Sequence, residues 1–171
     1  MNTDYLLSSD EEKDRQQLQS LFWESDAEAM LDQIGVHVGW KCIDLGFQNF
    51  DTELEKFPMQ YSPPTGCLLL ALSQNLPIGC VGARYFEDGI CEMKRLYVKP
   101  NFRAKHAGRL LAEAATKAGK SLGYERMMLD TLPSMKSANQ LYNSLGFVEI
   151  EPYRYNPIKG AKYLELSLKG L

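Results

Sequence analysis

A short segment between a strand and a helix constrains the fold of this chain more than any other feature. Arg103-Ala104-Lys105-His106-Ala107-Gly108 follows the strand-like run Ile90–Val98 and opens a helix-like run that reaches Ser121. Small residues let backbone N–H groups approach a ligand closely, and the positive end of a helix dipole attracts anions. The segment therefore predicts a strand, a loop and a helix whose N-terminus binds a pyrophosphate.

Two neighbouring segments strengthen this interpretation. Glu92-Met-Lys-Arg-Leu-Tyr-Val98 precedes the loop, and Asn139-Gln-Leu-Tyr142-Asn-Ser-Leu-Gly146-Phe147 follows its helix. In this order and spacing, the three segments resemble the GCN5-related N-acetyltransferase (GNAT) family, whose Arg/Gln-x-x-Gly-x-Gly/Ala loop grips the pyrophosphate of acetyl-CoA. The resemblance covers Cys67 to Phe147, and before Cys67 it rests only on element order. It implies an acyltransferase with acetyl-CoA as co-substrate.

Composition excludes several other classes of protein. The chain has 171 residues and a formal net charge of −3. Proteins that bind nucleic acids usually carry an excess of basic residues, which this chain does not have. It suits a single domain, 1–171, with a sizeable core. Met1 to Lys13 is polar and acidic, unlike a signal peptide, and no apolar run reaches membrane-spanning length. We therefore expect a cytoplasmic protein without nucleic-acid or membrane partners.

The cysteines and histidines do not predict a metal site or a disulfide framework. The four cysteines, Cys42, Cys67, Cys80 and Cys91, are too scattered for a CxxC motif, and the two histidines, His37 and His106, lie far apart. We expect reduced thiols that pack as small hydrophobic groups.

The remaining pattern alternates strands and helices. Asp4 to Leu7 predicts a first strand, the capping box at Ser9–Glu12 begins a helix, and Ala27–Gln33 and Asp51–Phe57 are candidate short helices. The later strands are predicted at Cys67–Leu72, Ile78–Tyr85, Ile90–Val98, Arg126–Thr131, Phe147–Ile150 and Lys162–Leu168, with a helix between Pro133 and Gly146. This order fits what the resemblance implies, an α/β (α+β) fold. Its sheet is mixed and mostly antiparallel, it has helices on both faces, and its fourth and fifth strands splay apart around the cofactor.

The resemblance also implies which residues hold acetyl-CoA. They are the fourth-strand residues Leu96, Tyr97 and Val98, the helix-entrance residues Arg103, Ala104, Lys105, His106, Ala107, Gly108 and Arg109, and Asn139 and Tyr142 on the later helix. A backbone amide near Leu96–Val98 would also stabilise the oxygen that becomes negative during transfer. His106 stands where the family most often has glycine. Because the first helical turn does not require a positive φ, we expect His106 to be tolerated there.

Two side chains are candidates for the chemistry itself. An amine must lose a proton before it attacks a thioester, and Glu92 occupies the place at which several family members carry a catalytic glutamate. The structural alternative is a strand glutamate that faces solvent or pairs with Lys94 or Arg84. Tyr142 matches a family tyrosine near the CoA sulfur, where a phenol protonates or hydrogen-bonds the leaving thiolate; its alternative is a core aromatic. Asn139, on the same helical face, would contact the pantetheine arm.

The acceptor and the catalytic route are less constrained. Acceptor-side candidates are Trp40, Phe57, Tyr61, Arg84, Tyr153, Arg154 and Tyr155. An acetyl-cysteine intermediate on Cys91 is disfavoured because no histidine lies nearby in the sequence to activate it. We expect direct transfer in a ternary complex to an amine of a small molecule or peptide. The alternative is a CoA-binding sensor or interaction module of the same fold, and the sequence leaves open whether the protein is a monomer or a homodimer.

Overall fold

The computed structural model describes residues 6–8, 59–73, 76–103 and 105–170. Within these ranges, seven strands form one sheet in the order β1-β2-β3-β4-β5-β7-β6. The strands are β1 (Leu6–Ser8), β2 (Cys67–Ser73), β3 (Leu76–Glu87), β4 (Ile90–Val98), β5 (Arg126–Thr131), β6 (Val148–Ile150) and β7 (Lys162–Ser167). The helices are α3 (Ala107–Ser121) and α4 (Lys136–Ser144), with short 3-10 turns η2 (Met59–Tyr61) and η3 (Pro100–Phe102). The helices predicted before residue 58 lie outside the described residues.

The sheet is mixed and mostly antiparallel, as predicted. Strands β1 to β4 pair antiparallel in sequence order, and β5, β7 and β6 form a second antiparallel group. The two groups join through one parallel contact between β4 and β5. Pro77 lies outside the predicted strand Ile78–Tyr85, but the structure places it in β3 opposite Leu72. A proline is tolerated near the start of a strand, where little pairing is lost.

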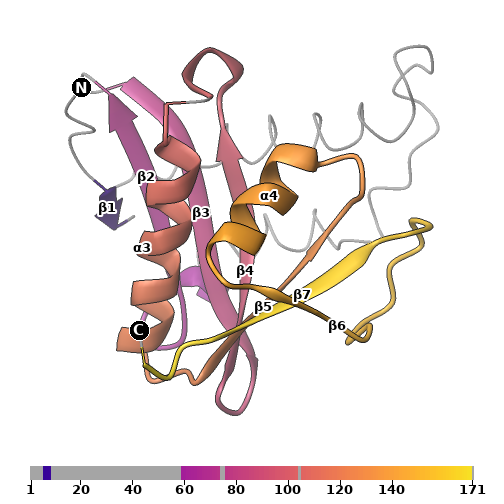
Figure 1. The fold of residues 1–171 in the computed structure, drawn as a ribbon. Helices are drawn as coiled ribbons and strands as arrows, with labels where there is room; N and C mark the ends of the chain where they lie inside the picture. The colour runs from indigo at the N-terminus through magenta and orange to yellow at the C-terminus, as the bar shows by residue number, and fades with distance from the viewer. Residues whose placement is uncertain (1–5, 9–58, 74–75, 104, 171) are drawn as a thin grey trace.

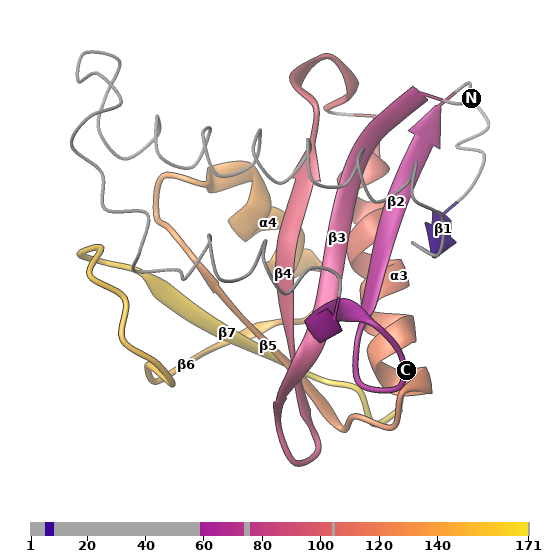
Figure 2. The same cartoon turned by 180° about the vertical axis from the view of Figure 1, so that it is seen from behind.

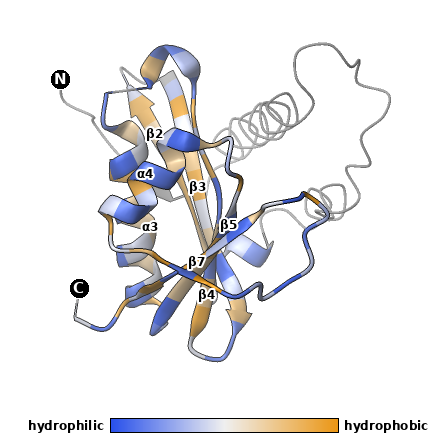
Figure 3. Ribbon diagram, turned by 45° about the vertical axis from the view of Figure 1, so that its right-hand side comes forward, coloured by the Kyte–Doolittle hydropathy of each residue, from blue (hydrophilic) through white to orange (hydrophobic). Residues whose placement is uncertain are grey.

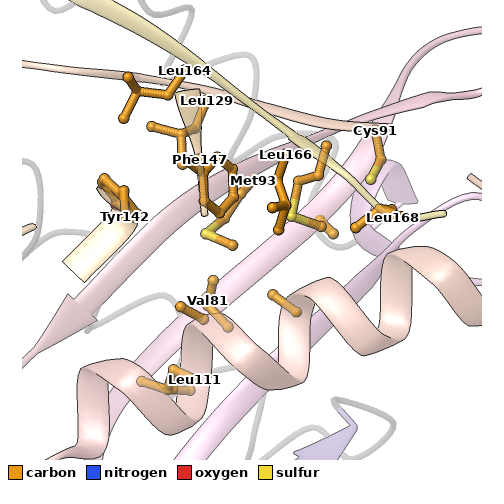
Figure 4. Close-up of a cluster of buried hydrophobic side chains, with 14 of the residues drawn as sticks. Val81, Cys91, Met93, Leu111, Leu129, Tyr142, Phe147, Leu164, Leu166 and Leu168 are labelled. Atoms are coloured by element: carbon orange, nitrogen blue, oxygen red, sulfur yellow. The ribbon is translucent and has the colours of Figure 1, made fainter. Parts of the chain in front are cut away.

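Both described helices, α3 and α4, pack against the same face of the sheet (Figure 1). The expectation of helices on the second face stays a prediction, because the other predicted helices lie outside the described residues. Val81, Met93, Leu111 and Tyr142 are among the buried side chains that fill the space between helices and strands (Figure 4). Gly119 lets α3 approach closely, since a Cβ there would lie 2.9 Å from Met127 Cε. The outer surface of the helices carries the polar residues of an amphipathic pattern (Figure 3).

The opposite face of the sheet is seen in Figure 2 and carries η2. A smaller apolar cluster there joins Tyr61 of η2 with Leu68, Leu70, Cys80 and Tyr97. Because side chains alternate along a strand, Arg84, Glu92 and Lys94 also point to this face, while Ala83 and Met93 point toward α3. The sheet thus has one apolar face under the helices and one face on which charged side chains gather.

Helix α4 ends where the sequence predicts. Its C-cap is Leu145, and Gly146 follows with φ 91°, a left-handed conformation that glycine adopts without steric cost. None of the helices in the described segments is long and apolar enough to cross a membrane.

Candidate active site at the opening between β4 and β5

Strands β4 and β5 pair over only three positions and then separate. The last of the parallel pairs is Glu92 with Met128. Beyond it, the β4 edge from Met93 to Val98 has no bridge to β5, although β4 continues to pair with β3. The predicted splay of the fourth and fifth strands is confirmed. Their divergence opens a backbone edge whose N–H and C=O groups can pair with an extended ligand.

Beyond this point β4 is irregular. Gly82 pairs with Lys94 and Cys80 with Tyr97, so Arg95 and Leu96 oppose Val81 alone, and Arg95 has φ 59°. A bulge of this kind bends a strand and re-aims its edge. Of the three predicted β4 contacts, Leu96 and Val98 are half-buried against the main core, and Tyr97 is buried against the opposite face.

Glu92 lies fully buried at the point of divergence and has donors on both oxygens. Arg84 bonds Oε2 through Nε at 3.0 Å and Nη2 at 2.8 Å. Tyr153 Oη donates to Oε1 at 2.9 Å, and Arg154 Nη1 lies 3.3 Å from the same oxygen. The pairing with Arg84, one alternative raised by the sequence, is observed. The ion pair with Lys94 is not, because Lys94 Nζ bonds Asp130.

A second carboxylate extends this network across the opening. Asp130 of β5 accepts hydrogen bonds from Lys94 Nζ at 3.3 Å, from Arg154 Nη2 and from Asn156 Nδ2 at 3.1 Å. Arg154 thus bridges a carboxylate on β4 and one on β5. Its own carbonyl accepts a hydrogen bond from Tyr163 Oη at 3.0 Å, which fixes the loop before β7. We call Arg84, Glu92, Lys94, Asp130, Tyr153 and Arg154 the polar cluster.

Charge and burial have opposite effects on the pKa values of the carboxylates in the polar cluster. Burial alone would raise the pKa of Glu92, but the charges of Lys94, Arg84 and Arg154 outweigh it and hold that pKa below its usual value. Asp130 behaves in the same way, and Lys94 and Arg154 hold its pKa far below normal. Burial lowers the pKa of Lys94. At neutral pH both carboxylates are therefore ionised and weakly basic.

Tyr142 of α4 lies on the other side of the opening. Its ring is buried and meets Phe147 edge-on, with centroids 5.7 Å apart (Figure 4). Burial, and then the charge of Asp130, raises the pKa of the phenol above its usual range. The hydroxyl is therefore protonated at neutral pH. It makes no hydrogen bond to any residue in the described ranges.

Asn139 contributes a polar atom without a partner. Its Nδ2 donates to the carbonyls of Leu132 at 2.8 Å and Met135 at 3.0 Å, which fixes the orientation of the amide. The Oδ1 atom is consequently left buried, with no donor among the described residues. An unpaired buried acceptor is costly, so this atom is a natural partner for an N–H group of a bound molecule.

The entrance to α3 differs from the expectation in one respect. His106 is the N-cap and has φ 64° and ψ 0°, so the position is left-handed and the prediction that no positive φ is required was wrong. The physical reason is that His106 lies just before the first helical turn. A left-handed N-cap also explains why glycine is favoured here, since other residues are strained in it.

This helix start leaves donors available. No side chain caps it, and the amides of Ala107, Gly108 and Arg109 have no acceptor within the helix. A Cβ on Gly108 would lie 3.7 Å from Val98 Cγ2 and 3.8 Å from Leu141 Cδ2, so this glycine faces the space between the end of β4 and α4. The helix N-terminus therefore lies at the mouth of the β4–β5 opening.

The cationic side chains of the loop are occupied by local contacts. Arg103 Nε donates to the Val98 carbonyl at 2.9 Å, and Lys105 lies over the Phe102 ring. Arg109 bonds Glu113 and, at 2.6 Å, Ser144 Oγ of α4. Ala104 lies outside the described residues.

Three of the acceptor-side candidates converge on Glu92: Arg84, Tyr153 and Arg154. Tyr61 is instead a core residue, Tyr155 is exposed, and Trp40 and Phe57 lie outside the described residues. Sequence reasoning did not identify Asp130 or Asn156, and it assigned Lys94 no role in the site. The signal available for Asp130 was an acid directly after three consecutive apolar residues, 127–129, within a predicted strand.

Comparison with known proteins agrees with this geometry. A model of the Acetyltransferase (GNAT) family matches residues 40–147. The chain belongs to the GNAT family. An uncharacterised N-acetyltransferase of Schizosaccharomyces pombe is 42% identical over 128 residues, which are 74% of this chain and 78% of that protein. The N-acetylaspartate synthetase of Danio rerio is 31% identical over 98 residues, 56% of this chain and 35% of that protein.

The fold is shared with solved acetyltransferase structures. An acetyltransferase from Salmonella typhimurium, solved with its cofactor acetyl-CoA, superposes with a TM-score of 0.65. The alignment covers 99% of this chain and 96% of that one at 14% identity, which shows the fold alone. Within the described ranges, no group of three His, Cys, Asp or Glu side chains could hold a metal ion.

Proposed function

We propose that this protein is an N-acetyltransferase that passes an acetyl group from acetyl-CoA directly to an amine of a small molecule or peptide. The observation that carries the proposal is the opening between β4 and β5. It has on one side a β4 edge without a bridge to β5, on the other the Oδ1 of Asn139 without a donor among the described residues, and at its mouth the start of α3, which no side chain caps. These features fit acetyl-CoA, which supplies the acyl thioester.

Each part of the cofactor has matching groups in this chain. The first-turn amides of α3 and the helix dipole suit the pyrophosphate. The backbone of Leu96–Val98 can pair with the amides of the pantetheine arm, and Asn139 Oδ1 can accept one of their N–H groups. A β4 amide directed into the opening can donate to the oxygen that gains charge during transfer.

Glu92 is the proposed acceptor of the amine proton, through a water molecule. Its position at the end of the β4–β5 pairing supports this role. Its low pKa and its donors on both oxygens make it a weak base, so it would pass the proton on and not retain it. The same features support the alternative that Glu92 only positions Arg84 and Arg154 and that water takes the proton.

Tyr142 is the proposed proton donor to the departing sulfur. The buried phenol is protonated at neutral pH, and its hydroxyl is not engaged by another described residue. Its raised pKa makes it a weak acid, which suits hydrogen bonding to the sulfur as the charge develops.

Direct transfer is supported by the state of Cys91. The thiol is fully buried, and burial raises its pKa to about 12. A neutral, inaccessible thiol is a poor nucleophile, so an acetyl-cysteine intermediate has no support here. The name of the Danio rerio relative denotes a synthetase of an acetylated amino acid, which supports a small amine as acceptor.

A thiol-release assay tests the proposal. The full chain is incubated with acetyl-CoA and a panel of amino acids, polyamines, aminoglycosides and peptides, and free CoA is measured against an enzyme-free control. We expect at least one amine to accelerate CoA release, with acetylated amine as product. Tight CoA binding without release for any amine would support the sensor module instead.

A further inference from the structure

The polar cluster places its carboxylates inward and its guanidinium groups outward. The side chains of Glu92 and Asp130 are only 1% and 7% exposed, whereas those of Arg84 and Arg154 are 22% and 26% exposed. A ligand that approaches this face therefore meets positive charge first. The carboxylates below hold the two arginines in fixed orientations.

One N–H group of Arg154 makes no hydrogen bond to the described residues. Its Nη1 lies 3.3 Å from Glu92 Oε1, and its Nη2 bonds Asp130. The third nitrogen, Nε, is buried and finds no acceptor among the described residues. An arginine that is held by two carboxylates and still has an unsatisfied N–H group can donate to one more anionic oxygen, because charge-assisted hydrogen bonds from a guanidinium are strong.

The positive charge on the outward face of the polar cluster does not depend on whether Lys94 is protonated. With Lys94 protonated, the polar cluster has three cations and two carboxylates; with it neutral, two of each. In both states the groups nearest the surface are Arg84 and Arg154, since Lys94 is buried. The outward face is cationic either way.

The location connects this face to the reaction. Glu92, to which both arginines are bound, is the last β4 residue paired with β5, so the guanidinium groups flank the inner end of the opening. An acceptor amine must reach this end to meet the thioester. A group a few bonds from that amine would lie within reach of Arg154.

We propose that the acceptor carries a carboxylate close to its amine, as an amino acid does, and that Arg154 binds this carboxylate with Arg84 adding positive charge beside it. This inference rests on the proposed acetyltransferase function and names its substrate class. Arg154 is then a specificity-determining residue, and Glu92 and Asp130 position it.

Matched acceptors test the inference. CoA release is measured with amino acids and with their carboxamides, such as glycine with glycinamide and aspartate with its diamide, and with a polyamine. The carboxamide amine loses its proton more readily, so a faster reaction with the acid cannot come from a more available nucleophile. We expect kcat/KM to favour the carboxylates by about tenfold or more, the effect of one charge-assisted hydrogen bond.

Variants assign the effect to Arg154. Arg154→Gln should lower kcat/KM for the carboxylate acceptors about 10- to 100-fold more than for the matching carboxamides. Arg154→Lys should restore part of the loss. The KM for acetyl-CoA should not change. Arg126→Gln is the matched control. It removes an exposed arginine at the start of β5 that pairs with Glu165 of β7, and it should behave as the unaltered protein.

The outcomes separate this inference from the function on which it rests. A preference of the unaltered protein for carboxamides or polyamines, or an equal loss for both acceptor classes in Arg154→Gln, would overturn the inference and leave the acetyltransferase intact. The absence of CoA release with every amine tested would overturn both. If Arg154→Gln fails to fold, the inference is still tested by the acceptor preference of the unaltered protein and by the kinetics of Arg154→Lys.

Discussion

The guanidinium of Arg84 donates two hydrogen bonds to a single oxygen of Glu92, at 3.0 and 2.8 Å. The carboxylate is therefore neutralised from one side by Arg84 and from the other by Arg154. Glu92 therefore holds Arg84 and Arg154 in place whether or not it also accepts a proton. The structural role and the role as proton acceptor make different predictions.

Glu92→Gln should destabilise the protein by about 3 kcal/mol, because it leaves two arginines facing a neutral amide. If Glu92 accepts the amine proton, kcat/KM should also fall and its rise with pH should flatten, while CoA affinity stays nearly unchanged. Asp130→Asn is the matched control, since it breaks the same network on β5. A folded Glu92→Gln protein with an unaltered pH–rate profile would leave only the structural role.

Acid should weaken the fold through the same two carboxylates. The pKa values of Glu92 and Asp130 are lowered in the folded protein, whereas they are about 4 in an unfolded chain. Their contribution to stability is thus present above the unfolded pKa and is lost as pH falls from about 5 toward the folded values. Urea unfolding at pH 7 and pH 4 should show a smaller loss for Asp130→Asn than for the unaltered protein. Equal losses would contradict this account.

Tyr142→Phe should lower kcat by about tenfold and change CoA affinity by less than about twofold, because it removes one hydroxyl and keeps the ring that packs on Phe147. Steady-state kinetics beside isothermal titration measures both. Tyr124→Phe, which removes a hydroxyl bonded to the Thr65 carbonyl, is the control. Unchanged turnover in Tyr142→Phe would make this residue a core aromatic only.

His106→Gly should stabilise the protein by about 1 kcal/mol, because it relieves a left-handed φ of 64°. CoA binding should stay equal or become tighter if backbone approach is what the phosphate site needs. His106→Ala keeps the strain and also removes the imidazole. If the imidazole itself bonds a phosphate, both variants should lose CoA affinity, which isothermal titration measures.

Local patterns predicted most of the described fold. The strands from Cys67 onward follow from apolar runs separated by turn residues, and Gly146 marks the end of α4 as expected. The backbone at His106 was not predictable, because one residue's φ depends on where the helix begins. Nor was the environment of Glu92: Tyr153 and Arg154 lie about 60 positions away in sequence, and only the return of the chain before β7 brings them to β4. The cytoplasmic location and the single-domain organisation stay predictions, and the choice between monomer and homodimer stays open.

The most direct test of the central claim compares acetyl-CoA turnover by the unaltered protein and by Gly108→Ala. The added methyl group makes only ordinary contacts, at 3.7 Å from Val98 and 3.8 Å from Leu141, and alanine favours a helix by about 1 kcal/mol or less. The variant should fold at least as well, yet it narrows the space between β4 and α4. The account predicts amine-dependent CoA release by the unaltered protein and a KM for acetyl-CoA raised about tenfold in Gly108→Ala, which is about 1.4 kcal/mol of binding. Amine-dependent release with an unchanged KM in the variant would contradict the placement of acetyl-CoA in this opening, and no release with any amine would contradict the proposed function itself.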